Sequence, residues 1–239
     1  MSEDFDEREY WPSKWSKRLP EDVICAVHYE LAIKETNKNK KEILSESNVP
    51  YSDSPTQLMD VYGRDLPPSS PWFVFIHGGY WIEYTKNCSG YCARPLWQAG
   101  IKVCVPDYDL APKAKLSEMV QQIQKMADYV LRRAESEGSS GVWICGHSAG
   151  AQLAARLLDE NWLSNLTRNP RRKQLFKGLF LIGGVYNLEP ILKLDEVNNV
   201  LKMAKEEAEE QSPINKVTDF KRKQLVAPGF RTIGDSDYR

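Results

Sequence analysis

A serine lies between two glycines in the stretch Gly146-His147-Ser148-Ala149-Gly150 of this 239-residue chain. This is the G-x-S-x-G pattern of a nucleophile elbow, which holds a serine on a sharp turn between a strand and a helix. The glycines let strand and helix approach closely and leave the Ser148 hydroxyl exposed. The alternative is a glycine-rich turn whose serine merely caps a helix, and five residues alone do not decide between the two.

The residues on either side of this turn favour the elbow. The apolar run Val142-Trp143-Ile144-Cys145 predicts a buried strand before it, and Leu153, Ala154, Leu157 and Leu158 recur at helical spacing after it. The N-terminus of such a helix also favours developing negative charge. Ser148 is therefore the candidate nucleophile.

A second glycine-rich turn, His77-Gly78-Gly79-Tyr80-Trp81, follows the apolar run 72–76. Because both turns follow strands, we expect them at the same edge of a parallel sheet. The backbone N–H groups of Gly78, Gly79 and Ala149 would then form an oxyanion hole, which stabilises the charge that develops on an attacked carbonyl. A turn that serves loop packing alone is the alternative.

The general base that would activate Ser148 is not evident in the sequence. In this arrangement an acid and then a histidine follow the serine along the chain, yet no histidine follows Ser148. We expect the side chain of His147 to point away from its neighbour, His77 to belong to the oxyanion turn, and His28 to lie in an N-terminal segment without a supporting motif. Each of the three is more readily a structural residue than a base.

The acid has one candidate after the serine. Asp235 follows a possible last strand and could occupy the acid position, although an exposed aspartate near the end of the chain is an equal alternative. Asp107 and Asp109 precede the serine and fit turn or supporting roles better.

Strands and helices alternate along the chain, which predicts an α/β fold with a mainly parallel central sheet and helices on both faces. We expect a single domain over 1–239, with a polar, largely helical segment at 1–47 and an incomplete catalytic core at 48–239. The expected strands are 58–62, 72–76, 101–105, 142–145, 176–182 and 225–233. The expected helices are 92–99, 117–137, one after the elbow, and others within 188–210.

Composition excludes several classes of function. The 33 acidic and 32 basic residues nearly cancel, so no strong field attracts nucleic acid or an anionic membrane. No apolar run reaches the length of a membrane span. The five cysteines lack metal-site spacing, and the acidic start of the chain is unlike a targeting signal. We therefore expect a cytoplasmic protein without a metal site.

Four segments together resemble the kynurenine formamidase (arylformamidase) family of α/β-hydrolases. They are the two glycine-rich turns, Asp107-Tyr108-Asp109-Leu110-Ala111-Pro112 and Gly184-Val185-Tyr186-Asn187-Leu188-Glu189-Pro190-Ile191. The most specific parts are Trp81 in the H-G-G-x-W form and Asp109 in Y-D-L-A-P, where related esterases usually have Y-R-L-A-P. The segment Tyr10-Trp11-Pro12-Ser13-Lys14-Trp15 is also similar to the N-terminal segment of that family.

The resemblance implies hydrolysis of N-formyl-L-kynurenine to L-kynurenine and formate in tryptophan breakdown. Ser148 would attack the formyl carbon, and aromatic residues such as Tyr80 and Trp81 would border the pocket for an aryl substrate, with His77 in the oxyanion turn beside them. Members of the family work without a metal or organic cofactor, are cytoplasmic and in some cases nuclear, and are commonly homodimers.

The chain departs from the family at its C-terminal end. Asp235-Ser236 is similar to the acid-bearing turn, but the histidine-bearing segment, with the last strand and helix, is absent from this sequence. We interpret the chain as a shortened form, in which loss of the base costs several orders of magnitude in rate. Two alternatives remain open: a small-acyl carboxylesterase with the same HGG loop, and an inactive form that binds ligand or dimerises.

Overall fold

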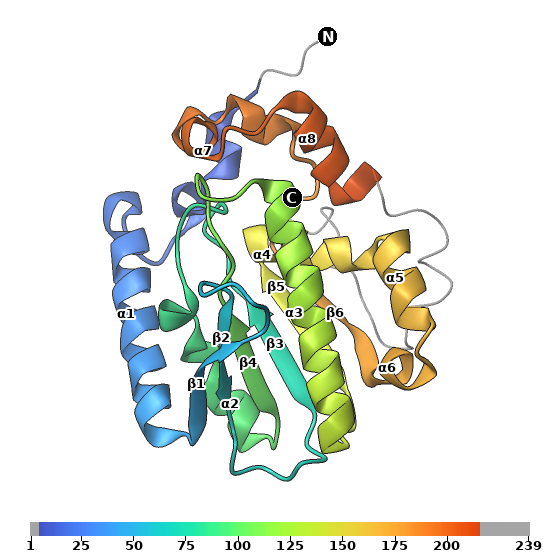
Figure 1. The fold of residues 1–239 in the computed structure, drawn as a ribbon. Helices are drawn as coiled ribbons and strands as arrows, with labels where there is room; N and C mark the ends of the chain where they lie inside the picture. Colours follow the sequence, from blue (N-terminus) through green and yellow to red (C-terminus); the bar gives the residue numbers. More distant parts are fainter. Residues whose placement is uncertain (1–4, 216–239) are drawn as a thin grey trace.

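The computed structural model describes residues 5–215, which form a six-stranded sheet with helices packed against it (Figure 1). The strands lie in the order β1-β2-β4-β3-β5-β6. Their bounds are Ser45–Pro50, Leu58–Tyr62, Trp72–Ile76, Lys102–Pro106, Val142–His147 and Phe176–Ile182 for β1 to β6. β2 runs antiparallel to both β1 and β4, whereas β4, β3, β5 and β6 are parallel to their neighbours. The mainly parallel α/β sheet predicted from the sequence is confirmed.

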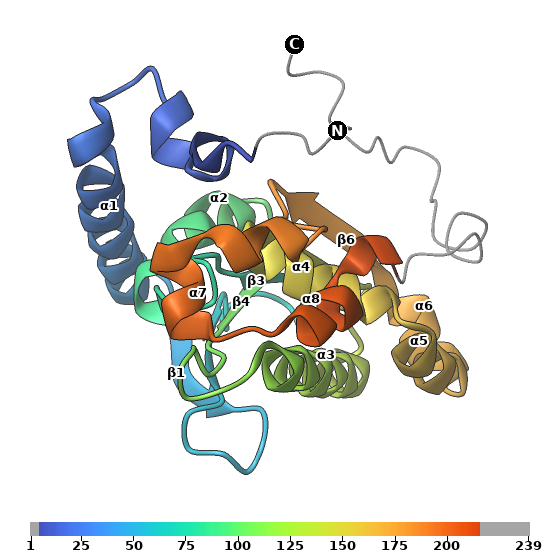
Figure 2. The same ribbon diagram turned by 90° about the horizontal axis from the view of Figure 1, so that it is seen from above.

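Helices cover both faces of the sheet, with α3 and α2 on opposite sides in Figure 2. The helix bounds are Glu21–Glu42, Ala93–Gln98, Leu116–Glu137, Ala149–Ala155, Glu160–Thr167, Pro170–Leu175, Asp195–Leu201 and Lys205–Gln211 for α1 to α8. The period of a strand explains the two layers, since alternate side chains point to opposite faces. In β4, Val103 and Val105 pack on the side of α2, while Cys104 joins the larger core that contains α3 and α4.

The predicted strands at 58–62, 72–76, 101–105, 142–145 and 176–182 are confirmed to within two residues, as are the helices at 92–99 and 117–137. The strand β1 within 45–50 was not predicted, and within 1–47 the main helix is α1. The strand expected at 225–233 and the candidate acid Asp235 lie outside the described residues.

The helix α1 is fastened to the sheet through its C-terminal half. The side-chain amide of Asn39 donates to the Gly90 carbonyl at 3.0 Å, and the Lys40 ammonium lies 2.7 Å from the carboxylate of Asp60 in β2. Asp60 is fully buried and also pairs with Lys86 at 3.3 Å. This buried charge cluster fixes α1 beside the sheet, so that the other half of the helix extends toward the carboxyl ends of the parallel strands.

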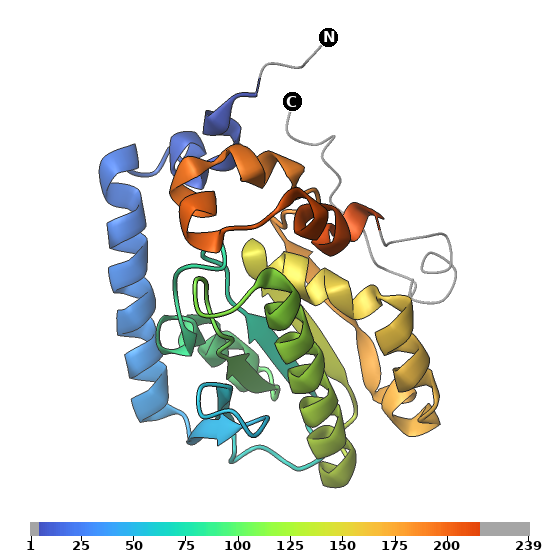
Figure 3. The ribbon, with the colours of Figure 1, turned by 45° about the horizontal axis from the view of Figure 1, so that its top comes forward.

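The helices α7 and α8 close the same end of the molecule, where Figure 3 shows them, in orange and red, next to the first described residues in dark blue. The Glu207 carboxylate of α8 accepts a hydrogen bond from the backbone N–H of Ser117 at 3.1 Å, and the Gln211 carbonyl accepts one from Gln152 of α4 at 2.9 Å. Within residues 5–215 no helix is both long and apolar enough to cross a membrane.

Candidate active site

Ser148 lies at the turn between β5 and α4 with backbone angles φ 53° and ψ −119°. A non-glycine residue adopts such angles only at a cost, which the surrounding structure must offset. The Ser148 N–H donates to the Ile182 carbonyl of β6 at 2.8 Å, and this bond holds the turn. The sharp strand-to-helix turn that the G-x-S-x-G pattern predicts is present.

The two glycines of the elbow are required by contact between backbones. A Cβ atom on Gly146 would lie 2.1 Å from the Gly150 carbonyl oxygen, and one on Gly150 would lie 2.3 Å from the carbonyl oxygen of Ile76 in β3. Neither position has room for a side chain, because the opposing atoms belong to the main chain. Close approach of α4 to β5 and β3 follows directly from these small residues.

The HGG turn lies against the nucleophile. A Cβ atom on Gly78 would lie 2.9 Å from the Cβ of Ser148, so the backbone of the turn reaches the serine itself. Within residues 5–215, the N–H groups of Gly78, Gly79 and Ala149 donate to no protein acceptor. Backbone donors that remain unused next to a serine among the described residues can stabilise an oxyanion.

His77 is a buried, neutral residue of this turn. Its ring stacks on Tyr108 with centroids 4.6 Å apart, and its Nδ1–H donates to the Gly78 carbonyl at 2.9 Å. Burial lowers the pKa of His77 from its ordinary value near 6.5 to about 4. A ring packed in this way orients the HGG backbone and is poorly suited to take a proton from Ser148.

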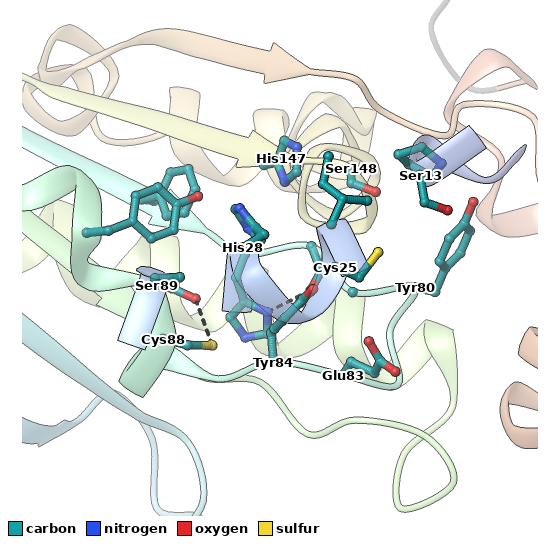
Figure 4. A pocket seen from close by; sticks show the side chains of 18 of the residues that line it. Ser13, Cys25, His28, Tyr80, Glu83, Tyr84, Cys88, Ser89, His147 and Ser148 are labelled. Carbon is teal, nitrogen blue, oxygen red and sulfur yellow. Dashed lines mark hydrogen bonds between the residues drawn. The ribbon is translucent and has the colours of Figure 1, made fainter. Parts of the chain in front are cut away.

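Ser148 opens into a cavity of about 360 Å³, a size that suits one aryl ring with short substituents. Figure 4 shows side chains from several elements around it. Part of its lining comes from the HGG turn and the loop after it, and another part from Trp11 and Ser13 near the N-terminus together with Cys25 and His28 of α1.

His28 is a cavity residue that sequence reasoning did not place at the site. Its ring lies edge-on to Tyr91 with centroids 6.3 Å apart. Cys25 and His28 are three residues apart, so they share one face of α1, but nothing in the sequence indicates which face meets the cavity. Within the described residues, the Ser148 hydroxyl makes no hydrogen bond to either of them.

His147 and Ser148 both line the cavity, and β5 extends to His147 before the chain turns. That the His147 side chain points away from Ser148 stays a prediction. Desolvation lowers the pKa of His147, and the nearby His28 lowers it further. Trp81 was expected to border the pocket, but its side chain is fully buried and its indole N–H donates to Gln152 at 3.0 Å. Trp81 therefore supports the loop from behind.

The remaining site residues lie as follows. Tyr80 lines the cavity. The carboxylate of Asp107 accepts a hydrogen bond from the Lys86 N–H at 2.6 Å, and that of Asp109 accepts one from Gln122 at 2.9 Å, so both tie loops together. The part of the chain that the structure describes contains no group of three or more histidine, cysteine or acidic side chains suited to a metal ion.

Comparison with known proteins agrees with this geometry. The family model of the alpha/beta hydrolase fold matches residues 73–225. Kynurenine formamidase from Danio rerio is 36% identical over 225 residues, covering 92% of this chain and 73% of the relative, and that from Drosophila melanogaster is 30% identical over 217 residues, covering 87% and 71%.

Solved structures show the same fold. A protein from Silicibacter sp. TM1040 superposes with a TM-score of 0.73 at 24% identity, covering 90% of this chain and 76% of the other. A thermostable carboxylesterase cloned from a metagenomic library superposes with a TM-score of 0.61 at 23% identity, covering 84% and 74%.

Proposed function

Because this chain belongs to the kynurenine formamidase family of the α/β-hydrolase superfamily, and is by family an amide hydrolase, we propose that its substrate is N-formyl-L-kynurenine and its products L-kynurenine and formate. The observation that carries the proposal is the contact between the HGG turn and Ser148, where the N–H groups of Gly78, Gly79 and Ala149 donate to no acceptor within residues 5–215. The cavity volume agrees with an aryl formamide. No metal or organic cofactor is part of the proposal.

In the proposed reaction, the Ser148 oxygen attacks the formyl carbon, and the carbonyl oxygen becomes an oxyanion. The N–H groups of Gly78, Gly79 and Ala149 would hold that oxyanion, with the His77 ring keeping the turn in place. Collapse of the intermediate breaks the C–N bond, and the departing aryl amine takes a proton. Water then attacks the formyl ester on Ser148 and releases formate.

The described site offers no evident general base to remove the proton of the Ser148 hydroxyl. No histidine follows Ser148 in the 239 residues, and His77 is neutral and occupied. We therefore propose that these residues supply the nucleophile and the oxyanion donors without the histidine that the family resemblance implies. When a triad is incomplete, the remaining members contribute little, because they act as a unit.

Rescue by an external base tests this proposal. We expect the purified chain to release kynurenine from N-formylkynurenine slowly in plain buffer, and added imidazole to raise the rate in proportion to its concentration, because imidazole can take the serine proton. Ser148→Ala is the matched control and is expected to show no response to imidazole. Equal rates for both proteins at every imidazole concentration would contradict Ser148 as the nucleophile.

Fast turnover without imidazole that is lost in Ser148→Ala would instead contradict the proposal that these residues lack a general base for Ser148. The histidine His28, which lines the cavity, would then be the first residue to substitute. The experiment therefore tests the role of Ser148 as nucleophile and the lack of a general base independently.

Hydrolysis of a small ester is the second candidate. A methylesterase from Oryza sativa, described as a probable isoprenylcysteine alpha-carbonyl methylesterase, is 30% identical over 154 residues, 61% of this chain and 36% of that protein. Parallel rates on N-formylkynurenine and on a short-chain aryl ester, both with imidazole, distinguish the two candidates. We expect the formamide to be preferred.

We further propose that the chain forms a homodimer and lies in the cytoplasm, or also in the nucleus, as the family resemblance implies. The third reading from the sequence, an inactive form that binds ligand or a longer subunit, predicts no imidazole response and recovery only with such a subunit. A stable homodimer that responds to imidazole would exclude it.

A further inference from the structure

The loop that follows the HGG turn is held in one conformation. Tyr80, Trp81 and Tyr84 have φ angles of 46°, 61° and 69°, which side-chain-bearing residues rarely adopt. The Gly79 carbonyl accepts hydrogen bonds from the N–H groups of both Ile82 and Glu83 at 2.9 Å. With Trp81 also buried behind it, the loop presents its cavity-facing side chains from a fixed backbone.

Glu83 gives this wall of the cavity its charge. Among the described residues that line the cavity it is the one aspartate or glutamate, and no lysine or arginine accompanies it. Within residues 5–215 the Glu83 carboxylate forms no salt bridge. Figure 4 shows Glu83 between Tyr84 and Tyr80, with its carboxylate directed toward the side of the pocket where Cys25 lies. A carboxylate in this position favours a cationic group on the ligand.

The two tyrosines beside Glu83 each contact another aromatic ring. The Tyr80 ring lies 5.5 Å from that of Trp11, and the Tyr84 ring lies 5.7 Å from that of Tyr29, measured between centroids. Rings supported in this way keep their position when a ligand binds. Aromatic rings next to a carboxylate form the environment that attracts an ammonium group.

We propose that Glu83, together with Tyr80 and Tyr84, binds a primary ammonium group of the substrate, so that the site selects aryl amides that carry such a group. This inference rests on the proposed function, since it places the reacting formamide at Ser148 and the amino group of the same molecule at Glu83. The described cavity wall offers no lysine or arginine to a carboxylate. A carboxylate on the ligand is therefore not required.

The inference ranks three ligands by charge alone. N-formylkynurenine carries an ammonium and a carboxylate, its decarboxylated analogue carries only the ammonium, and its deaminated analogue carries only the carboxylate. We expect the decarboxylated amine to bind at least as tightly as the parent compound. We expect the deaminated acid to bind about five- to tenfold more weakly, the size of effect that an exposed ion pair with neighbouring aromatic rings supports.

The test measures binding by titration calorimetry in the Ser148→Ala background, where hydrolysis does not interfere. Glu83→Gln in the same background removes the charge and keeps the shape, and is expected to abolish the preference for the two ammonium ligands. The matched control is Glu160→Gln, an exposed glutamate at the start of α5, away from the cavity lining, which is expected to change nothing.

Equal affinity for the parent compound and the deaminated acid with Glu83 present would overturn the inference. A preference that survives Glu83→Gln would also overturn it, because the charge would then be recognised elsewhere. Neither result depends on turnover, so the imidazole experiment on hydrolysis still decides the proposed function by itself.

Discussion

Burial decides what each histidine at this site can do. His77 stacks on Tyr108 and is buried, so its neutral form is favoured, whereas His28 and His147 line the cavity from two different elements. A neutral His77 ring donates from Nδ1 to the Gly78 carbonyl and in this way orients the backbone that would hold an oxyanion. We therefore expect the histidine of the HGG turn to act as a positioning residue.

The depressed pKa of His77 predicts a pH dependence of stability. The folded protein keeps His77 neutral down to about pH 4, whereas the unfolded chain takes up the proton near pH 6.5. The stability that His77 contributes is therefore complete above pH 6.5 and is lost as the pH falls toward 4. Between pH 7 and pH 5 this amounts to about 2 kcal/mol of unfolding free energy.

Urea unfolding at pH 7 and pH 5 measures this loss, and His77→Gln provides the comparison. Glutamine cannot take up a proton, so the variant is expected to lose about 2 kcal/mol less than the parent between the two pH values, whatever its stability at pH 7. An equal loss in the two proteins would mean that His77 does not remain neutral in the fold.

At the scale of elements, the elbow is where strand, turn and helix depend on one another most closely. Gly146 follows the apolar part of β5, and the backbone of α4 lies in direct contact with the backbone of Gly146. Gly146→Ala must move one main chain relative to another, so we expect it to lower the unfolding free energy by about 3 kcal/mol. Urea unfolding measures the loss.

Gly141→Ala is the control for the elbow glycine. A Cβ atom there would lie 2.6 Å from Cε and 2.7 Å from Cγ of Lys177, so it meets a side chain that can change rotamer and no main chain. We expect this variant to change stability little. If both alanine variants were equally stable, the glycines would not be required by the close approach of α4 to β5.

The sequence was most informative where one element buries its own apolar run. The runs at 72–76 and 142–145 are continuous apolar segments, and the turns after them carry the glycines that the chemistry needs. β1 escaped prediction because its charged and polar residues have no apolar alternation, and only pairing with β2 makes it a strand. His28 and Glu83 escaped because contacts between distant segments, such as Lys40 with Asp60, decide what faces the cavity.

At the scale of the whole molecule, the two edges of the sheet differ. β1 ends at Pro50 and has an irregular register between Glu46 and Val49, features that discourage pairing with another chain. β6 ends instead with Leu181 and Ile182, both exposed, and among the strands within residues 5–215 it is the last in the sheet order. An exposed apolar edge strand tends to associate with another strand.

We therefore expect the purified chain to self-associate through β6, and Leu181→Lys to weaken the association, because a lysine on an edge strand opposes pairing between chains. Sedimentation velocity over a range of protein concentrations measures it. Leu44→Lys is the matched control, since Leu44 is 62% exposed but precedes β1 at the other side of the sheet. If both variants associated as the parent does, a homodimer would have to form through another surface, whereas loss of association in Leu181→Lys alone would place β6 at the interface. Either result constrains the assembly without touching Ser148, because Leu181 is not among the cavity-lining residues.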